Sequence, residues 1–326
     1  MYPELIEIPF VHLTVKSYGL MMVIGFLACV SLIRHLSRDF TFNPQHITNA
    51  ALYSLVGGVV GARLFFVFHH FENFRSNPLE IFFIWQGGLE LVGGVAVFIM
   101  VILFYIWYHK LPMRRYLDVL AIGLMLALVF GRIGCFLNGC CYGKPTDLLW
   151  GVRFPYYSFA YHSQISPDFD RNRSEPYLEL PDEFFGYTDE KGNRYSGLKP
   201  YEYLTTKQKI EVNEGKYRCL PVHPTQLYSS GIAAFWCLML YVIWRRTKKA
   251  ELSGNSGKFF TKPGCIFALM FIVYGTTRFL MEYLRDDNPF EFDSLTISQN
   301  IGIGMVVLGV ILIVVFKAMK VQPVDI

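Results

Sequence analysis

The amino-acid sequence predicts an all-α polytopic membrane protein with seven transmembrane helices and an extracytoplasmic insertion. The first reason is composition: 53% of the 326 residues are hydrophobic and 17% are charged, which is more apolar than a soluble domain needs. The second reason is that the apolar residues form seven stretches, each long enough to cross about 30 Å of hydrocarbon as a helix. The basic residues lie in short clusters between these stretches, which argues against a nucleic-acid-binding face.

The connections between the predicted spans differ in charge. The spans lie near residues 16–36, 47–69, 89–109, 117–137, 223–245, 263–284 and 296–317. Basic clusters follow the first, third, fifth and seventh spans: Arg34 and Arg38; Lys110, Arg114 and Arg115; Arg245, Arg246, Lys248 and Lys249; Lys317 and Lys320. By the positive-inside rule this side is cytoplasmic, so we expect the N-terminus outside and the C-terminus inside. The first span is expected to be retained, because Glu4 and Glu7 stand where a signal peptide would be basic.

A long polar segment, residues 138–222, separates the fourth span from the fifth. It is rich in tyrosine and is interrupted by Pro155, Pro167, Pro176, Pro181 and Pro200. This pattern predicts an extracytoplasmic cap and argues against another span. We therefore expect three regions: 1–143 with four membrane helices, 144–222 as the cap, and 223–326 with three membrane helices.

One predicted span carries an arginine inside the membrane. The sequence there is Gly131-Arg132-Ile133-Gly134-Cys135-Phe136-Leu137-Asn138-Gly139-Cys140-Cys141-Tyr142-Gly143. A charge at this depth needs a partner, a water-filled cavity or a ligand, so Arg132 marks a candidate functional site.

Several polar residues from five different spans fall at the outer rim of the membrane in this topology. They are Arg63, Glu90, Arg132, His223, Gln226, Arg278 and Glu282. Tyr274, Arg278 and Glu282 are four residues apart and so share one helical face. Several arginines and fewer carboxylates would form a cationic pocket that suits the phosphate of a phospholipid headgroup. The alternative is that Arg278–Glu282 and Arg63–Glu90 are buried structural ion pairs.

Two glycine pairs, Gly87-Gly88 and Gly93-Gly94, flank Glu90. They indicate that the backbone closely approaches a ligand or another helix. Glu90 itself either pairs with Arg63 or Arg132 or has a catalytic role, and the sequence leaves both interpretations open.

The stretch from Gly131 to Gly143 resembles the signature of the prolipoprotein diacylglyceryl transferase family, G-R-x-G-N-F-x-N-G-E-x-x-G. Further matches occur in the family's order and cover all the predicted spans. They are Tyr18-Gly19-Leu20, Gly61-Ala62-Arg63, Gly93-Gly94, Asp118, His223-Pro224-Thr225-Gln226-Leu227-Tyr228, and Tyr274-Gly275 with Arg278 and Glu282. The chain departs from the family at three positions: Cys135 replaces an asparagine, Cys140 replaces a glutamate, and Val92 replaces a histidine proposed as an acid/base group.

The resemblance implies a transferase of the bacterial inner membrane. Such an enzyme moves a diacylglyceryl group from phosphatidylglycerol to the lipobox cysteine of a prolipoprotein, forming a thioether and releasing glycerol phosphate. The lipid bilayer, phosphatidylglycerol and a signal peptide with a lipobox cysteine are the expected partners, nucleic acid is not, and no cofactor is expected.

The resemblance also implies roles for individual residues. Arg132 and Arg278 would stabilise the charge on the leaving phosphate. Substrate-binding residues would be Tyr18, Arg63, Gly93, Gly94, Asn138, Gly143, Gln226 and Tyr274. Because Val92 replaces the histidine, the base is left open among Tyr18, His223, Glu90 and Glu282. The two carboxylates rank first, and they complete the predicted catalytic set with the arginines.

The seven cysteines divide into two groups. Cys29, Cys237 and Cys265 lie inside apolar spans and are expected to pack as small residues. The outer group, Cys135, Cys140, Cys141 and Cys219, lies in an oxidising compartment, where a disulfide from Cys219 to Cys140 or Cys141 can form. No metal site is predicted, because Cys-x4-Cys-Cys with His223 fits no common zinc spacing.

Two other functions remain as alternatives. The replaced residues at Val92, Cys135 and Cys140 allow a family member that has lost the transfer chemistry and binds or moves anionic phospholipid. The neighbouring thiols of Cys140 and Cys141 allow a membrane thiol-disulfide protein.

Overall fold

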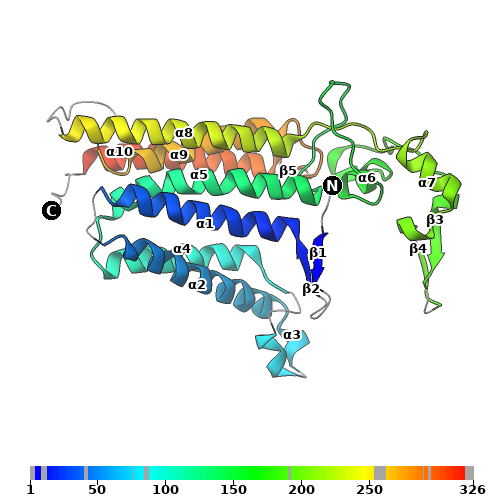
Figure 1. Cartoon of the computed structure of the whole chain (residues 1–326), viewed down its shortest axis with the longest axis horizontal. Coiled ribbons are helices and arrows are strands. Elements are labelled where there is room, and N and C mark those ends of the chain that lie inside the picture. Colours follow the sequence, from blue (N-terminus) through cyan, green and yellow to red (C-terminus); the bar gives the residue numbers. More distant parts are fainter. Residues whose placement is uncertain are drawn as a thin grey trace. The chain divides into compact units, whose positions relative to one another are not determined.

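The computed structural model describes residues 4–8, 13–39, 43–75, 77–83, 88–189, 192–252, 262–288, 290–292 and 295–319 (Figure 1). Long helices dominate it. They are α1 (Ser17–Ser37), α2 (Gln45–His69), α4 (Leu91–Tyr108), α5 (Met113–Asn138), α8 (Thr225–Leu252), α9 (Cys265–Glu282) and α10 (Ile297–Ala318). Within the described residues, all of these except α4 are long and apolar enough to cross a membrane, six in number. The prediction of an all-α polytopic membrane protein is thus confirmed as to its helical class and its several membrane-spanning helices.

The third predicted span corresponds to a shorter apolar helix, Val92–Tyr108. The other helices lie close to their predicted ranges, because long apolar runs define membrane helices well. Seven spans and the orientation of the termini remain predictions.

Shorter elements lie between the long helices. They are β1 (Glu4–Ile8), β2 (Leu13–Lys16), α3 (Phe71–Phe74), α6 (Phe159–Gln164), β3 (Phe185–Thr188), β4 (Arg194–Leu198), α7 (Thr206–Asn213), β5 (Phe290–Phe292) and β6 (Leu295–Thr296). The strands form three antiparallel pairs, β1–β2, β3–β4 and β5–β6. The sequence analysis did not predict them, because strands of two to five residues are too short to show a clear alternation of apolar and polar residues.

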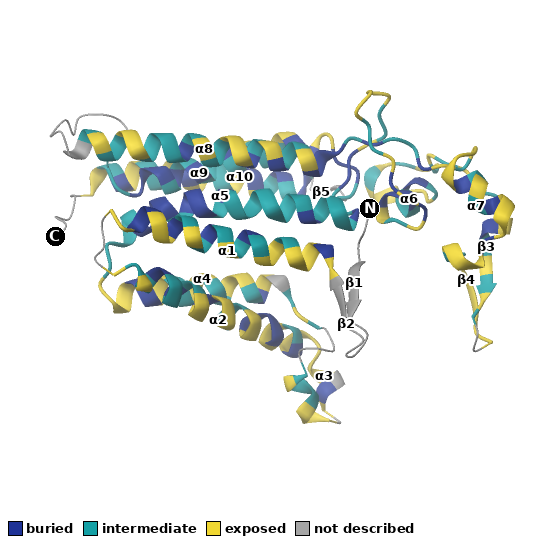
Figure 2. Ribbon diagram, viewed as in Figure 1, coloured by how far each residue is buried: buried dark blue, intermediate teal, exposed yellow. Residues whose placement is uncertain are grey.

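The chain forms two compact units. The first contains residues 1–26, 125–241 and 268–313, and the second contains residues 27–124, 242–267 and 314–326. Large apolar side chains are exposed along the long helices, among them Val56, Met100, Leu238 and Val314 (Figure 2). Exposed apolar surface of this extent is typical of helices that face lipid.

Helices α2 and α4 of the second unit lie side by side (Figure 1). Glycines allow this contact. A Cβ atom at Gly61 would lie 2.5 Å from Val97, and one at Gly93 would lie 2.3 Å from Phe65. At Gly94 the nearest atoms, 3.1 Å away, belong to Ala62 and Gly58. The pair Gly93-Gly94 therefore serves close helix packing, as small residues commonly do in membranes.

Asp118 connects α5 to the start of α9 within the second unit. Its side chain is buried. One carboxylate oxygen accepts a hydrogen bond from the backbone N–H of Gly264 at 2.7 Å, and the other accepts from Phe267 at 2.9 Å. The N–H of Gly264 lies directly before α9 and that of Phe267 lies in its first turn, where N–H groups have no intrahelical acceptors. Asp118 thus acts as a cap contributed by another helix.

We expect Asp118→Ala to lower the free energy of unfolding by about 1–3 kcal/mol, since it leaves two buried N–H groups without their acceptor. Asp118→Asn, which keeps one carbonyl oxygen, should lose less. Thermal unfolding in detergent measures both variants. Equal stability of the alanine variant and the wild type would contradict this role.

In the first unit, the segment after α5 has its own apolar core. The core consists of Tyr142, Phe154, Tyr156, Ala160, Tyr161, Phe184, Leu198, Leu204, Val212, Cys219 and Val222. Residues from across the segment thus pack together, as expected of a folded cap. Its assignment as a separate extracytoplasmic region, 144–222, remains a prediction.

Candidate functional site

A pocket opens in the first unit among α5, α8 and α9. Arg132, Tyr274 and Arg278 supply its strongest polar groups, together with the hydroxyls of Ser229 and Thr277. The rest of the lining is mainly apolar: Met125, Leu128, Ile232, Ala233, Trp236 and Met281. The pocket is thus suited to a molecule with both an anionic and an apolar part, such as a phospholipid.

The two arginines of this pocket differ in how they are held. Among the described residues, the Arg132 guanidinium has no hydrogen-bond or ion-pair partner. Arg278 forms an ion pair with Glu282, with Nη1 3.2 Å from Oε2, and donates a hydrogen bond to the Ser298 hydroxyl. Arg132 is therefore the cation available to a ligand, and Arg278 is a second cation with a fixed orientation.

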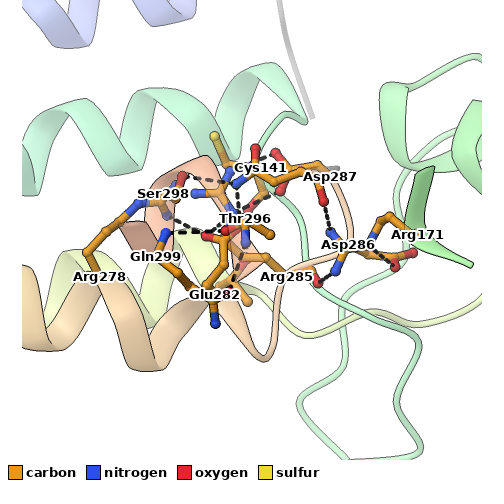
Figure 3. Close-up of polar contacts among 12 residues, drawn as sticks. Cys141, Arg171, Arg278, Glu282, Arg285, Asp286, Asp287, Thr296, Ser298 and Gln299 are labelled. Atoms are coloured by element: carbon orange, nitrogen blue, oxygen red, sulfur yellow. Dashed lines mark hydrogen bonds and ion pairs between the residues drawn. The ribbon is translucent and has the colours of Figure 1, made fainter. Parts of the chain in front are cut away.

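Glu282, the ion-pair partner of Arg278, is part of a buried polar network (Figure 3). Its side chain is only 1% exposed, and its Oε2 lies 3.8 Å from Arg285 Nε. The Asn288 amide donates a hydrogen bond to Oε1. The expected Arg278–Glu282 ion pair is thus present. Two guanidinium groups and an amide hold this carboxylate in one orientation, so the geometry favours a positioning role.

Sequence reasoning missed the ionic contacts that follow α9. The Arg285 guanidinium donates two hydrogen bonds to the Asp287 carboxylate, at 2.8 and 2.7 Å. The next residue, Asp286, lies 3.6 Å from Arg171 and 3.2 Å from Arg173, both of which come from the cap segment (Figure 3). Burial raises the pKa of Asp286, and these arginines oppose that shift. The four consecutive polar residues Arg285, Asp286, Asp287 and Asn288 were the signal available in the sequence.

The motif from His223 to Tyr228 holds the backbone that follows α5. Gly143 N–H donates to the His223 carbonyl at 3.0 Å. The Thr225 hydroxyl donates to the Cys141 carbonyl, and the Gln226 amide donates to the Cys140 carbonyl, both at 2.7 Å. Gln226 is buried, and its Oε1 has no hydrogen-bond partner among the described residues. Its side chain therefore holds the loop that follows α5.

Other predicted site residues of the first unit lie around the same helix end. Gly134 of α5 packs against Tyr18 of α1, since a Cβ atom there would be 3.2 Å from the tyrosine ring. Tyr18 also interacts electrostatically with Arg132. Asn138 is the last residue of α5, and its side chain lies near the Cys140 thiol. The imidazole of His223 faces the Tyr228 hydroxyl at 3.4 Å.

Arg63 and Glu90 belong to the second unit and do not form the expected pair. Arg63 donates hydrogen bonds to the backbone carbonyls of Ile81, Gly88 and Glu80. The ion-pair partner of Glu90 in the described part of the chain is His69, whose Nδ1 lies 2.8 Å from Oε1. The Arg63–Glu90 ion pair, one of the alternatives left open by the sequence, is thus absent, because Arg63 binds the loop carbonyls and Glu90 pairs with His69. Gly87, of the first glycine pair, lies outside the described residues.

We expect Arg63→Ala to lower the free energy of unfolding by at least about 1.5 kcal/mol, because it removes charge-assisted hydrogen bonds from three carbonyls. Arg63→Lys should recover part of this loss, since one ammonium can reach only some of these acceptors. Limited proteolysis of the connection between α2 and α4 provides the measurement. Unchanged cleavage in the alanine variant would show that Arg63 does not hold this loop.

Three thiols meet where α5 ends. The sulfur atoms of Cys135, Cys140 and Cys141 all lie within 4.8 Å of one another. Hydrogen bonds from the Cys135 and Cys140 thiols, and then the charges of Arg285 and Arg132, lower the pKa of Cys141. The spacing of these cysteines in the sequence did not predict that their thiols converge.

The disulfide considered between Cys219 and Cys140 or Cys141 is absent from the structure, in which Cys219 is a free thiol. Cys219 is buried in the core of the cap segment. Its Sγ lies 3.4 Å from the side-chain oxygen of Gln164. Burial raises the pKa of this thiol to about 11. The packing of the cap thus keeps Cys219 away from disulfide chemistry.

The chain is similar to one family of known proteins along nearly its whole length. The model of a family described as prolipoprotein diacylglyceryl transferase matches residues 3–315. Relatives called phosphatidylglycerol–prolipoprotein diacylglyceryl transferase include one from Clostridium tetani, 28% identical over 95% of this chain and 96% of the relative. Others are from Bordetella bronchiseptica, 26% identical over 91% and 89%, and Synechococcus elongatus, 26% identical over 98% and 88%. The chain therefore belongs to the prolipoprotein diacylglyceryl transferase family.

Proposed function

We propose that this protein transfers a diacylglyceryl group from phosphatidylglycerol to the lipobox cysteine thiol of a prolipoprotein. The observation that carries the proposal is the pocket among α5, α8 and α9, in which Arg132 and Arg278 stand beside an apolar lining. The relatives named for this activity support it. The protein is accordingly a multi-pass transferase of the bacterial inner membrane.

In the proposed reaction, a cysteine thiolate attacks the glycerol carbon that bears the phosphate ester. The carbon–oxygen bond breaks, glycerol phosphate leaves with the electron pair, and a thioether forms. Negative charge grows on the leaving phosphate, so cations already in position stabilise the transition state more than the ground state. Arg132, with no partner among the described residues, supplies this stabilisation, and Arg278 assists from the same pocket.

The remaining residues have supporting roles in this proposal. Tyr274 lines the pocket one turn before Arg278, so its hydroxyl is placed to orient the headgroup. Asn138, Tyr18 and Gln226, whose amide holds the Cys140 carbonyl, would orient substrate at the nearby end of α5. Glu90, paired with the half-exposed His69, and Glu282, paired with Arg278, stay candidate catalytic residues of this proposal.

The proposed topology has seven spans, with α4 as the third. The N-terminus lies outside and the C-terminus in the cytoplasm, since the basic connections after α1, α4, α8 and α10 share one side. This arrangement places the end of α5 at the outer leaflet, where a secreted prolipoprotein and the phospholipid would meet.

The test is transfer of a labelled diacylglyceryl group to a lipobox peptide by the purified protein in detergent. Phosphatidylglycerol is the donor, and phosphatidylcholine, whose phosphate carries choline in place of glycerol, is the matched control. We expect transfer from phosphatidylglycerol alone, and none to a peptide with serine in place of the cysteine. Binding of phosphatidylglycerol without transfer would establish instead a lipid-binding protein that has lost the chemistry.

A further inference from the structure

The three thiols at the end of α5 are brought together by an unusual backbone turn. Gly139 and Cys141 both adopt left-handed conformations, with φ of 78° and 61°. The chain therefore folds back over the last turn of the helix, where the Cys140 N–H donates to the Cys135 carbonyl at 3.2 Å. A left-handed conformation is unfavourable for cysteine, so the surrounding contacts must hold it. Those contacts are the hydrogen bonds from Thr225 and Gln226 to this loop.

The spacing of the sulfur atoms fits a metal ion. All three lie within 4.8 Å of one another, and three thiolates bound tetrahedrally at about 2.3 Å from zinc would be roughly 3.8 Å apart. Small side-chain rotations would thus close the cluster around an ion. The thiols are partly buried, and no thiol of the cluster is bonded to another cysteine in the structure.

The charges around the cluster also favour bound thiolates. Arg132 and Arg285 interact electrostatically with Cys141, and Figure 3 shows Cys141 beside the Arg285 network. A zinc ion with three thiolates carries a single net negative charge, which these guanidinium groups would offset. Three protein ligands leave one coordination position open, the arrangement typical of catalytic zinc.

We propose that Cys135, Cys140 and Cys141 bind a zinc ion whose fourth position takes the substrate thiolate. This inference rests on the proposed function. A zinc ion would replace the acid/base histidine expected from the family, since that position is Val92 in this chain. A zinc-bound thiol loses its proton at neutral pH, so the metal performs the activation that a base would otherwise provide.

With zinc bound, no protein base is needed to remove the proton of the substrate thiol. The substrate thiol releases its proton to water as its sulfur binds zinc. The zinc-bound sulfur attacks the glycerol carbon, the carbon–oxygen bond to phosphate breaks, and the oxygen keeps the electron pair. The thioether product is a weaker ligand than a thiolate and leaves the metal, and glycerol phosphate departs past Arg132.

The first experiment measures zinc in the full-length protein purified in detergent. We expect about one zinc per chain, lost in the variant with serine at all three positions (C135S/C140S/C141S) and retained in Cys237→Ala, a matched control from α8. Cys140→Ser serves as a second variant if the triple variant does not fold, and its zinc should be bound at least about tenfold more weakly. Absence of zinc from the wild type after incubation with zinc salt would overturn the proposal, as would a disulfide within the cluster under those conditions.

The second experiment asks whether the metal contacts the substrate. Cobalt substituted for zinc should give thiolate charge-transfer absorption, and a lipobox peptide with cysteine should change it while the serine peptide does not. An unchanged spectrum with the cysteine peptide would overturn the substrate role. Chelation should reduce diacylglyceryl transfer at least about 100-fold, and zinc should restore it.

These measurements separate the two proposals. Full transfer by a folded protein without metal would overturn the zinc proposal and leave the transferase intact. A cobalt spectrum that responds to the cysteine peptide, with no transfer from phosphatidylglycerol, would support the metal site and overturn the proposed function.

Discussion

Arg132→Ala is expected to reduce diacylglyceryl transfer by about 10²–10³-fold, the effect of removing one pre-positioned donor from a developing negative charge. The side chain lines the pocket and has no hydrogen-bond or ion-pair partner among the described residues. Its removal should therefore affect the reaction more than the fold. Initial rates of transfer to a lipobox peptide measure this, with thermal unfolding recorded for the same preparation.

Two further variants serve as comparisons for Arg132→Ala. Arg132→Lys keeps the charge but not the planar, bidentate donor pair, and should recover only part of the rate. Arg75→Ala, an exposed arginine paired with Glu72, is the matched control and should retain full activity. A folded Arg132→Ala protein with wild-type rates would remove Arg132 from the mechanism.

Arg278 should behave differently from Arg132. It is bound to Glu282 and Ser298, so Arg278→Ala would also leave a buried carboxylate without one of its partners. Loss of both activity and stability is the expected combination at this position. The contrast between the two arginines follows from their partners, not from their place in the sequence.

Gly143→Ala is expected to abolish activity by displacing the loop after α5. A Cβ atom at this position would lie 2.6 Å from His223 Cβ, 2.7 Å from the His223 carbonyl oxygen and 2.8 Å from the Leu284 carbonyl oxygen. Two of these atoms belong to the backbone, which cannot move aside without breaking the contact between residues 143 and 223. Overpacking of this kind costs about 1–3 kcal/mol, and we expect a lower unfolding temperature with loss of transfer.

Gly231→Ala provides the matched control for Gly143. Gly231 lies in α8, and among the described residues no atom outside its own stretch of helix lies within 4 Å of the position its Cβ would occupy. Replacement of a helical glycine by alanine stabilises a helix by about 0.8–1.0 kcal/mol, so this variant should be as stable as the wild type or more so. A Gly143→Ala protein as stable and active as Gly231→Ala would show that the loop tolerates the added methyl group.

Gly143 has a packing role that the sequence did not predict, because its position lies directly against His223 and Leu284. The substrate-binding role implied by its match to the family signature stays a prediction. The same holds for Gly93 and Gly94, whose lack of side chains lets α2 and α4 approach each other. A sequence marks such positions as constrained but cannot show whether a ligand or another part of the chain occupies the adjacent space.

By itself, the sequence determined the long helices and singled out Arg132, Tyr274 and Arg278, which line the pocket. Long apolar runs can satisfy their backbone groups in lipid only as helices, so hydropathy located α1, α5 and α10 to within a few residues. An arginine inside such a run must have a cavity, a partner or a ligand, and Arg132 indeed lines a pocket with Arg278 and Tyr274.

Only the tertiary structure decided which groups meet. Arg63 contacts loop carbonyls, not Glu90, and Glu90 pairs with His69, because the path of a loop determines its contacts and spacing along the chain does not. The convergence of Cys135, Cys140 and Cys141 depends on two left-handed residues in one turn. Such a conformation is set by contacts with distant residues such as Thr225, so no local pattern in the sequence could predict the thiol cluster.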